Sequence, residues 1–218
     1  MLESNQIQTP LKKLLQEYAL GDEKINKLQS FGEILQDWNQ KINLIAPSTE
    51  KELWERHLYD SLVLLHLQHL PQLLKASRWA DLGSGAGLPA IPLAIALEQI
   101  EVHPVERVGK KSAFQTFCKA HLKIPNLHPR NLRYEELAKE GERFGVITSR
   151  ALDQISNLLT QSRDLLTPQG YILLWKGKNW KEEEAQVPAS IKAEFSLLEQ
   201  YSYGKGRGEL LLYQFTRN

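Results

Sequence analysis

Three glycines at alternate positions follow a short apolar stretch that carries a carboxylate. Asp81 lies in that stretch, and Gly83, Gly85 and Gly87 come next, ahead of a helical pattern. Glycine has no Cβ, so its backbone can turn sharply and can approach a bound molecule more closely than other residues can. A strand, a glycine-rich turn and a helix form the first unit of a doubly wound α/β sheet, in which ligands bind beyond the carboxyl ends of the strands. The sequence therefore predicts a ligand-binding loop, and Ser84 belongs to it.

The glycine spacing disfavours two common phosphate ligands of such loops. A dinucleotide fingerprint requires G-x-G-x-x-G, but Leu88 stands where its third glycine would be. A nucleoside-triphosphate loop requires a lysine directly after its last glycine, and the next lysine here is Lys110. The remaining common ligand is S-adenosylmethionine, whose carboxylate can lie near the loop amides and the positive end of the following helix.

Glu106 is the predicted partner of the cofactor's sugar. It follows an apolar-rich run at residues 100–105 and lies 19 positions after Gly87. A carboxylate at the end of the second strand can accept hydrogen bonds from both ribose hydroxyls. Pro104 lies within this run and cannot donate to a sheet ladder, so the exact start of the strand stays open.

The elements that position these residues alternate between strands and helices after residue 70. Before it, apolar residues recur at three- and four-residue intervals in three helical patterns, with Asp22 as the predicted N-cap of the second and Ser48 or Thr49 as that of the third. Further along, the sequence predicts strands near 78–82, 100–105, 127–131, 144–148 and 170–176, helices near 89–98, 109–122 and 151–167, and a closing hairpin of 196–203 and 209–215.

This order predicts an α/β fold: a Rossmann-like, doubly wound, mostly parallel sheet with an antiparallel terminal hairpin and an N-terminal helical extension. We expect residues 1–70 to form the extension and residues 71–218 the cofactor-binding core, within one structural domain.

Composition limits the class of protein more than it identifies a partner. The 218 residues have a formal net charge of +1, so any affinity for nucleic acid must come from local patches. The single Cys118 and the absence of a basic-then-apolar leader at residues 1–4 indicate a reducing cytoplasm. No apolar run approaches the roughly 18 residues of a membrane-spanning helix, so no membrane partner is expected. No metal site suggests itself, and a monomer is the default expectation.

Several sequence blocks together resemble a known family. The glycine loop after Asp81 resembles the first motif of the class I methyltransferases. Nearly the whole chain resembles the bacterial 16S ribosomal RNA guanine-N7 methyltransferases of the glucose-inhibited division protein B family, through WNQKINLI at 38–45, RHLYDSL at 56–62, LPAIPLA at 88–94, KKSAF at 110–114, RYEE at 133–136 and TSRA at 148–151.

The resemblance implies contacts to S-adenosylmethionine and a reaction. The residues it implies as cofactor contacts are Gly83, Leu88, Tyr134, Glu135 and Arg150, with Tyr134 and Glu135 beside the adenine. Arg150, just past the fourth predicted strand, could also orient the base and is the one candidate catalytic residue. The implied substrate is a guanine of 16S ribosomal RNA, in free RNA or in the 30S subunit. Guanine N7 has an exposed lone pair, so attack on a methyl group needs no general base, and positioning is the main task.

Substrate RNA requires positive charge near the cofactor. Residues 107–133 contain seven Lys and Arg and no Asp or Glu. Within this run Lys110 and Lys111 are the preferred RNA contacts, and Lys176 and Arg207 would extend the same rim. Two alternatives stay open: a methyltransferase of this fold that acts on a small molecule or a protein, and a non-enzymatic RNA-binding module.

A hydrolase reading of the third helical pattern is disfavoured. His57, Asp60 and Ser61 lie at i, i+3 and i+4, which places them on one helix face and cannot set an acid behind the histidine with the serine in front. We expect His57 and Asp60 to join this helix to the sheet near the cofactor.

Overall fold

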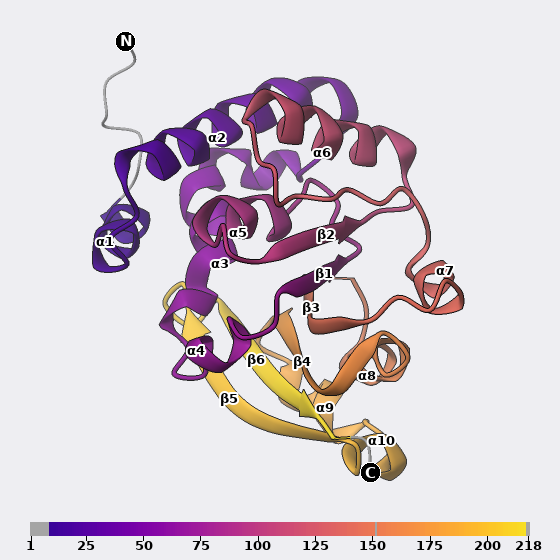
Figure 1. The fold of residues 1–218 in the computed structure, drawn as a ribbon. Helices are drawn as coiled ribbons and strands as arrows, with labels where there is room; N and C mark the ends of the chain where they lie inside the picture. The colour runs from indigo at the N-terminus through magenta and orange to yellow at the C-terminus, as the bar shows by residue number, and fades with distance from the viewer. Residues whose placement is uncertain (1–8, 151, 217–218) are drawn as a thin grey trace.

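The structure, a computed structural model, describes residues 9–150 and 152–216 (Figure 1). Residues 1–4, on which the expectation about a leader rests, lie outside the described residues. So does Ala151, the last residue of one resemblance block and the first of a predicted helix.

A single six-stranded sheet forms the centre of the fold in the order β2-β1-β3-β4-β6-β5. The first four strands pair in parallel, and β6 pairs antiparallel with both β4 and β5. The strand bounds are β1 Arg78–Leu82, β2 Glu101–Val105, β3 Phe144–Arg150, β4 Leu166–Lys176, β5 Phe195–Tyr203 and β6 Gly208–Phe215. The predicted fold class is therefore confirmed, and β4 begins four residues before the predicted start.

Helices cover both faces of this sheet and bury side chains that alternate along each strand. In β1, for example, Trp79 joins one hydrophobic cluster and Ala80 joins the other. In Figure 1, α2, α5 and α6 lie on one side of the sheet, and α7 to α10 lie towards the other. Their bounds are α2 Asp22–Ile42, α5 Ala90–Ala96, α6 Gly109–His121, α7 Tyr134–Lys139, α8 Ile155–Ser162, α9 Trp180–Ala185 and α10 Ala189–Lys192. The predicted helix at 151–167 is thus shorter, and the short α7, α9 and α10 were not predicted.

The segment between α2 and the sheet is irregular where the sequence predicts one amphipathic helix. After α1 (Thr9–Glu17) and α2, the chain forms a 3-10 turn η1 (Pro47–Glu52), a π-helical stretch η2 (Leu53–Tyr59), a single turn α3 (Asp60–Leu62), another 3-10 turn η3 (Val63–His66) and α4 (Leu70–Leu73). Its apolar residues are buried as the periodicity requires, and Leu53, Leu58 and Leu62 share the cluster of α1 and α2.

Both predicted N-caps are wrong. Gly21 caps α2, and Asp22 is its first helical residue, where its negative charge still complements the positive end of the helix. Ser48 and Thr49 lie inside η1, which starts at Pro47 because the fixed φ of proline suits the first position of a helix.

The predicted strand at 127–131 is also wrong, and Pro104 explains why. The N–H groups of Val102 and Glu106 donate to the carbonyl oxygens of Asn126 and Arg130. Pro104, between them, has no N–H, so the ladder is interrupted and only isolated bridges form, at Leu127 and Arg130. Pro104 nevertheless lies inside β2, opposite Asp81, because its missing donor faces the outer edge of the sheet rather than β1.

Within residues 9–150 and 152–216, no helix combines the length and the apolar character needed to cross a lipid bilayer.

Gly145 tests the packing at the start of β3. A Cβ at this position would lie 2.4 Å from the Cβ of Ala76, in the loop that leads into β1. Gly145→Ala should therefore lower the free energy of unfolding by about 1–3 kcal/mol through overpacking, measured by urea denaturation. Gly177→Ala is the matched control, because no atom lies within 4 Å of its added Cβ. Equal unfolding midpoints for the two variants would contradict the packing at Gly145.

Candidate functional site

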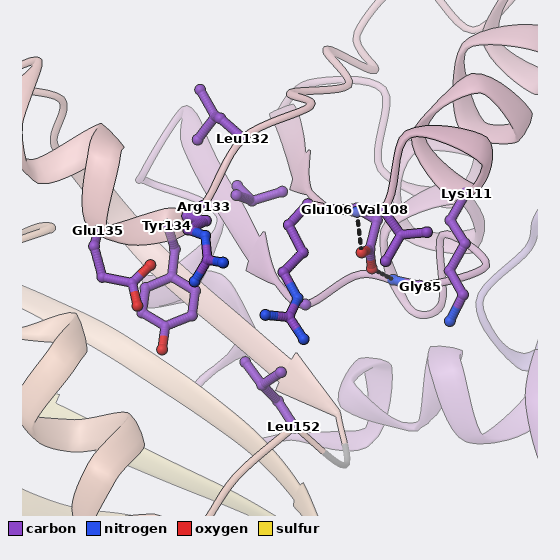
Figure 2. A pocket seen from close by; sticks show the side chains of 12 residues that line it. Gly85, Glu106, Val108, Lys111, Leu132, Arg133, Tyr134, Glu135 and Leu152 are labelled. Atoms are coloured by element: carbon purple, nitrogen blue, oxygen red, sulfur yellow. Dashed lines mark hydrogen bonds between the residues drawn. The ribbon is translucent and has the colours of Figure 1, made fainter.

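A cavity of about 410 Å³ opens at the carboxyl ends of β1 and β2 (Figure 2). Its walls come from the glycine loop, the segment after β2, the start of α7 and the segment after β3. The lining residues are Gly83, Gly85, Val105, Glu106, Arg107, Val108, Lys111, Leu132, Arg133, Tyr134, Glu135 and Leu152. The cavity thus lies where the sequence predicts a ligand.

The glycine loop turns directly from the end of β1. The N–H groups of Gly83 and Ser84 both donate to the carbonyl oxygen of Val105, at 3.0 and 3.1 Å, which fastens the loop to β2. Gly83, Gly85 and Gly87 have φ values of +67°, +54° and +75°, a region that side chains with a Cβ rarely adopt. A Cβ on Gly83 would also lie 2.5 Å from Leu152, so this position requires glycine for space as well as for conformation.

Glu106 holds the loop from the neighbouring strand. One of its carboxylate oxygens, Oε2, accepts a hydrogen bond from the N–H of Gly85 at 2.9 Å, and Oε1 accepts one from the N–H of Val108 at 2.8 Å. From α6, the side-chain amide of Gln115 donates to the carbonyl of Gly85 at 2.8 Å. Both backbone groups of Gly85 are therefore fixed by buried side chains.

The opposite wall is formed by the first turn of α7. Arg133 is its N-cap, and its N–H donates to the carboxylate of Glu136, which orients the turn. Figure 2 shows Tyr134 and Glu135 across the cavity from Glu106 and Gly85, with Leu152 between the two sides. A ligand that spans the cavity would meet a carboxylate at one end and an aromatic and apolar surface at the other.

Asp81 lies beneath the loop and does not line the cavity. Its side chain is buried, and Oδ1 accepts a hydrogen bond from the Thr148 hydroxyl at 2.8 Å. Across the described residues, neither Oδ2 of Asp81 nor the hydroxyl of Ser84 has a hydrogen-bond partner. Burial raises the pKa of Asp81 to about 6.

The structure brings together only part of the predicted cofactor set. Gly83, Gly85, Glu106, Tyr134 and Glu135 line one cavity. Ser84, Gly87 and Leu88 are not among the residues that line it. All three are buried or nearly so, and a Cβ on Gly87 would meet Ile91 at 2.4 Å. Three other lining residues, Val108, Leu132 and Leu152, were not predicted from the sequence, and Arg107 was predicted only as part of the basic run at 107–133.

Arg150 lies in a different cavity, of about 220 Å³, together with Lys176 and Arg207. Its guanidinium donates to the carbonyl oxygens of Arg56 at 2.6 Å and His57 at 3.3 Å. Lys176 donates to the carbonyl of Asp153 and forms an ion pair with Glu183 at 2.5 Å. Of the two lysines predicted on α6, Lys111 lines the larger cavity and Lys110 is exposed beside it.

Asp60 joins this segment to the sheet as expected, although at the second cavity, whereas the ring of His57 contacts η1 instead of the sheet. The His57 ring is hydrogen-bonded to the Thr49 hydroxyl at 2.9 Å, and burial lowers its pKa to about 4. The backbone carbonyl of Asp60 accepts a hydrogen bond from the Trp175 indole of β4 at 2.6 Å, which ties η2 and α3 to the sheet. In the part of the chain that the structure describes, no group of three or more His, Cys, Asp or Glu side chains could hold a metal ion.

Comparison with known proteins identifies a family that resembles most of the chain. The family model GidB, described as rRNA small subunit methyltransferase G, matches residues 24–209. The ribosomal RNA small subunit methyltransferase G of Azoarcus sp. (strain BH72) is 40% identical over 163 residues, which cover 75% of this chain and 74% of that relative. The protein of the same name from Syntrophotalea carbinolica is 36% identical over 190 residues, 85% of each chain.

Two solved structures superpose on the fold of this chain. An O-methyltransferase from Bacillus cereus in complex with SAH superposes with a TM-score of 0.65 at 14% identity, over 95% of this chain and 98% of that one. A ribosomal protein L11 methylase from Lactobacillus delbrueckii subsp. bulgaricus gives a TM-score of 0.56 at 15% identity, over 74% and 79% of the two chains. At these identities the likeness establishes a shared methyltransferase fold.

The raised pKa of Asp81 predicts a pH-dependent gain in stability for Asp81→Asn. A carboxyl group whose pKa is higher in the folded chain than in the unfolded chain opposes folding once the unfolded form ionises. The contribution of the Asp81 carboxyl group to the free energy of unfolding is therefore fully present below its ordinary pKa of 3.8, and it is lost as the pH rises to about 6.

Asp81→Asn removes this ionisation and retains an oxygen for the Thr148 hydroxyl. Relative to the wild type, the variant should gain up to about 3 kcal/mol in the free energy of unfolding between pH 4 and pH 7. Urea denaturation at several pH values measures this difference. If the difference in unfolding free energy between the variant and the wild type were equal at pH 4 and pH 7, the raised pKa of Asp81 would be contradicted.

Proposed function

The chain belongs to the rRNA small subunit methyltransferase G family, and on that premise we propose that it transfers the methyl group of S-adenosylmethionine to N7 of a guanine in 16S ribosomal RNA. The observation that carries the proposal is the cavity at the carboxyl ends of β1 and β2, with a buried carboxylate at one end and Tyr134 at the other. An rRNA substrate implies action in the cytoplasm, and the proposal takes the enzyme as a monomer.

The donor atoms around the cavity fit this cofactor. Each oxygen of the Glu106 carboxylate can accept two hydrogen bonds, and the backbone N–H groups of Gly85 and Val108 use one on each. One acceptor position therefore remains on each oxygen, which suits the two adjacent hydroxyls of a ribose. We propose that Glu106 holds the sugar, with the loop of Gly83, Ser84, Gly85, Gly87 and Leu88 around the methionine part.

The opposite wall suits a planar, largely apolar ring. Leu132, Tyr134 and Leu152 line that side, and the carboxylate of Glu135 can accept a hydrogen bond from an exocyclic amine. Tyr134 and Glu135 are therefore proposed as the adenine contacts. When bound, S-adenosylmethionine supplies an electrophilic methyl group.

The residues around the cavity have a positioning task in this reaction. The N7 atom of guanine presents its lone pair without prior loss of a proton, so no group is needed to remove one. Holding the two reactants in line at near-attack distance can lower the barrier by roughly 7–11 kcal/mol at the upper end. Arg150 is proposed to orient the base or the RNA from the neighbouring cavity rather than to exchange protons.

Positive charge for the RNA surrounds the cavity mouth. Arg107, Lys111 and Arg133 line the cavity, and Lys110 is exposed at the start of α6. We propose that Lys110 and Lys111 contact the phosphate backbone, together with Arg207 on the far side. Lys176, which the sequence also predicts there, is 8% exposed and paired with Glu183, so it supports that side from within.

A methyl-transfer assay tests the proposed function. With labelled S-adenosylmethionine, the protein should label RNA in 30S subunits or in naked 16S RNA, and nuclease digestion should release the label as 7-methylguanosine. Comparison of the two RNA substrates decides which form is used. Label found only in a small molecule, or only in protein, would reject the proposal.

Glu106→Ala tests the cofactor site independently of the RNA. The variant should bind S-adenosylmethionine at least tenfold more weakly, because hydrogen bonds to a charged group contribute about 1.5–3 kcal/mol each. Isothermal titration calorimetry measures the dissociation constant. Glu101→Ala is the matched control at the start of β2, where the carboxylate is 53% exposed and lies 3.8 Å from Arg78. Equal affinities for the two variants would exclude the proposed role of Glu106.

A further inference from the structure

The second cavity lies beside the proposed cofactor cavity and is lined by several cations. Arg150, at the end of β3, lines the second cavity, and Leu152, two residues later, lines the first. The cations of the second cavity are Arg56, Arg150, Lys176 and Arg207, and its lining contains one carboxylate, Asp60.

Asp60 lies at the centre of this cluster. Its side chain is 4% exposed, and Oδ1 accepts a hydrogen bond from Nη2 of Arg207 at 2.8 Å. Its other oxygen, Oδ2, lies 3.7 Å from Nη2 of Arg150. The two arginines come from β3 and from the turn between β5 and β6, so one carboxylate brings together parts of the sheet that are distant in sequence.

Backbone carbonyls of η2 hold the same two arginines. Arg150 donates to the carbonyls of Arg56 and His57, and Arg207 donates to that of Glu55. Such π-helical stretches often occur at functional sites. Here the stretch presents three successive carbonyls to guanidinium groups, which fixes both side chains from a second direction.

Arg207 keeps donors for a ligand. The hydrogen bonds of its side chain to the described residues all start from Nη2, so Nε and Nη1 remain for other acceptors. The turn is shaped around this side chain, because a Cβ on Gly204, whose φ is +59°, would lie 2.8 Å from Cζ of Arg207.

The net charge of the cluster matches one phosphodiester. Lys176 is paired with Glu183, and Arg56 is paired with Glu52. Arg150 and Arg207 therefore share the single carboxylate of Asp60, which leaves one positive charge. Nε and Nη1 of Arg207 can each donate a charge-assisted hydrogen bond to a phosphate oxygen.

We propose that Asp60 is a positioning residue for the RNA: it holds Arg207, and with it Arg150, so that their guanidinium groups bind a backbone phosphate next to the target nucleotide. This inference rests on the proposed function. It assigns to Asp60 no contact with the cofactor or with the reacting atoms.

A double-mutant cycle tests the proposal. Asp60→Asn and Arg207→Gln should each raise KM for the RNA by about tenfold while the dissociation constant for S-adenosylmethionine changes by less than about twofold. Because Asp60 acts through Arg207, KM for the RNA in the double variant should be no higher than in the more impaired of the two single variants. Independent effects that multiply in the double variant would overturn the proposal, as would an unchanged KM in a folded Asp60→Asn protein.

A salt titration supplies a second readout. Arg207→Gln should lower the slope of log affinity for RNA against log salt concentration by about one, as expected for the loss of one phosphate contact. This variant keeps Asp60, so it tests the phosphate contact even if circular dichroism shows that Asp60→Asn does not fold. An unchanged slope in folded Arg207→Gln would overturn the proposal.

Glu199→Gln is the matched control for loss of a paired carboxylate. Glu199 accepts hydrogen bonds from the backbone N–H groups of Gln68 and His69 and lines neither cavity. The Glu199→Gln variant should have a lower free energy of unfolding than the wild type and an unchanged KM for the RNA. If the wild type binds S-adenosylmethionine but methylates no RNA, the proposed function fails. If the wild type methylates RNA and only the Asp60 and Arg207 results fail, this inference alone is wrong.

Discussion

One buried carboxylate, that of Glu106, joins the parts of the cavity that no single element could hold. It receives the N–H of Gly85 from the loop after β1 and the N–H of Val108 from the segment that leads into α6. Hydrogen bonds to an ionised acceptor are roughly twice as strong as neutral ones, and burial strengthens them further. They stabilise a loop that must keep three residues at positive φ.

The parallel order of β2, β1 and β3 explains why two cavities lie side by side. All three strands end at the same edge, so the glycine loop, Glu106 and Arg150 emerge close together although they are up to 67 residues apart in sequence. Arg150, the last residue of β3, lines one of these cavities, and Leu152 lines the other. The antiparallel hairpin then brings Arg207 to the same edge from the far end of the sheet.

Much of this arrangement could be predicted from local patterns, and the exceptions have identifiable causes. The glycine spacing and the apolar runs gave β1, β2, the loop and the position of Glu106, because backbone conformation and burial there depend on neighbouring residues. The family resemblance, carried by six blocks, agrees with the family match over residues 24–209. The π-helical form of η2 was not predictable from local sequence. Its carbonyl oxygens accept hydrogen bonds from Arg150 of β3 and from Arg207 of the hairpin, which come close to η2 only in the folded chain. The same distant contacts separate Arg150 from the other predicted cofactor residues.

Pro104 has a consequence for the behaviour of the protein at high concentration. The outer border of β2 would otherwise offer a continuous row of donors and acceptors, to which an unfolded or foreign chain could add itself as a new strand. Instead, residues 126–130 run along that border with only intermittent pairing, and the proline removes the central donor. Residues 126–130 thus cover this rim of the sheet, and the imino acid leaves the rim one donor short without loss of the pairing on its inner side.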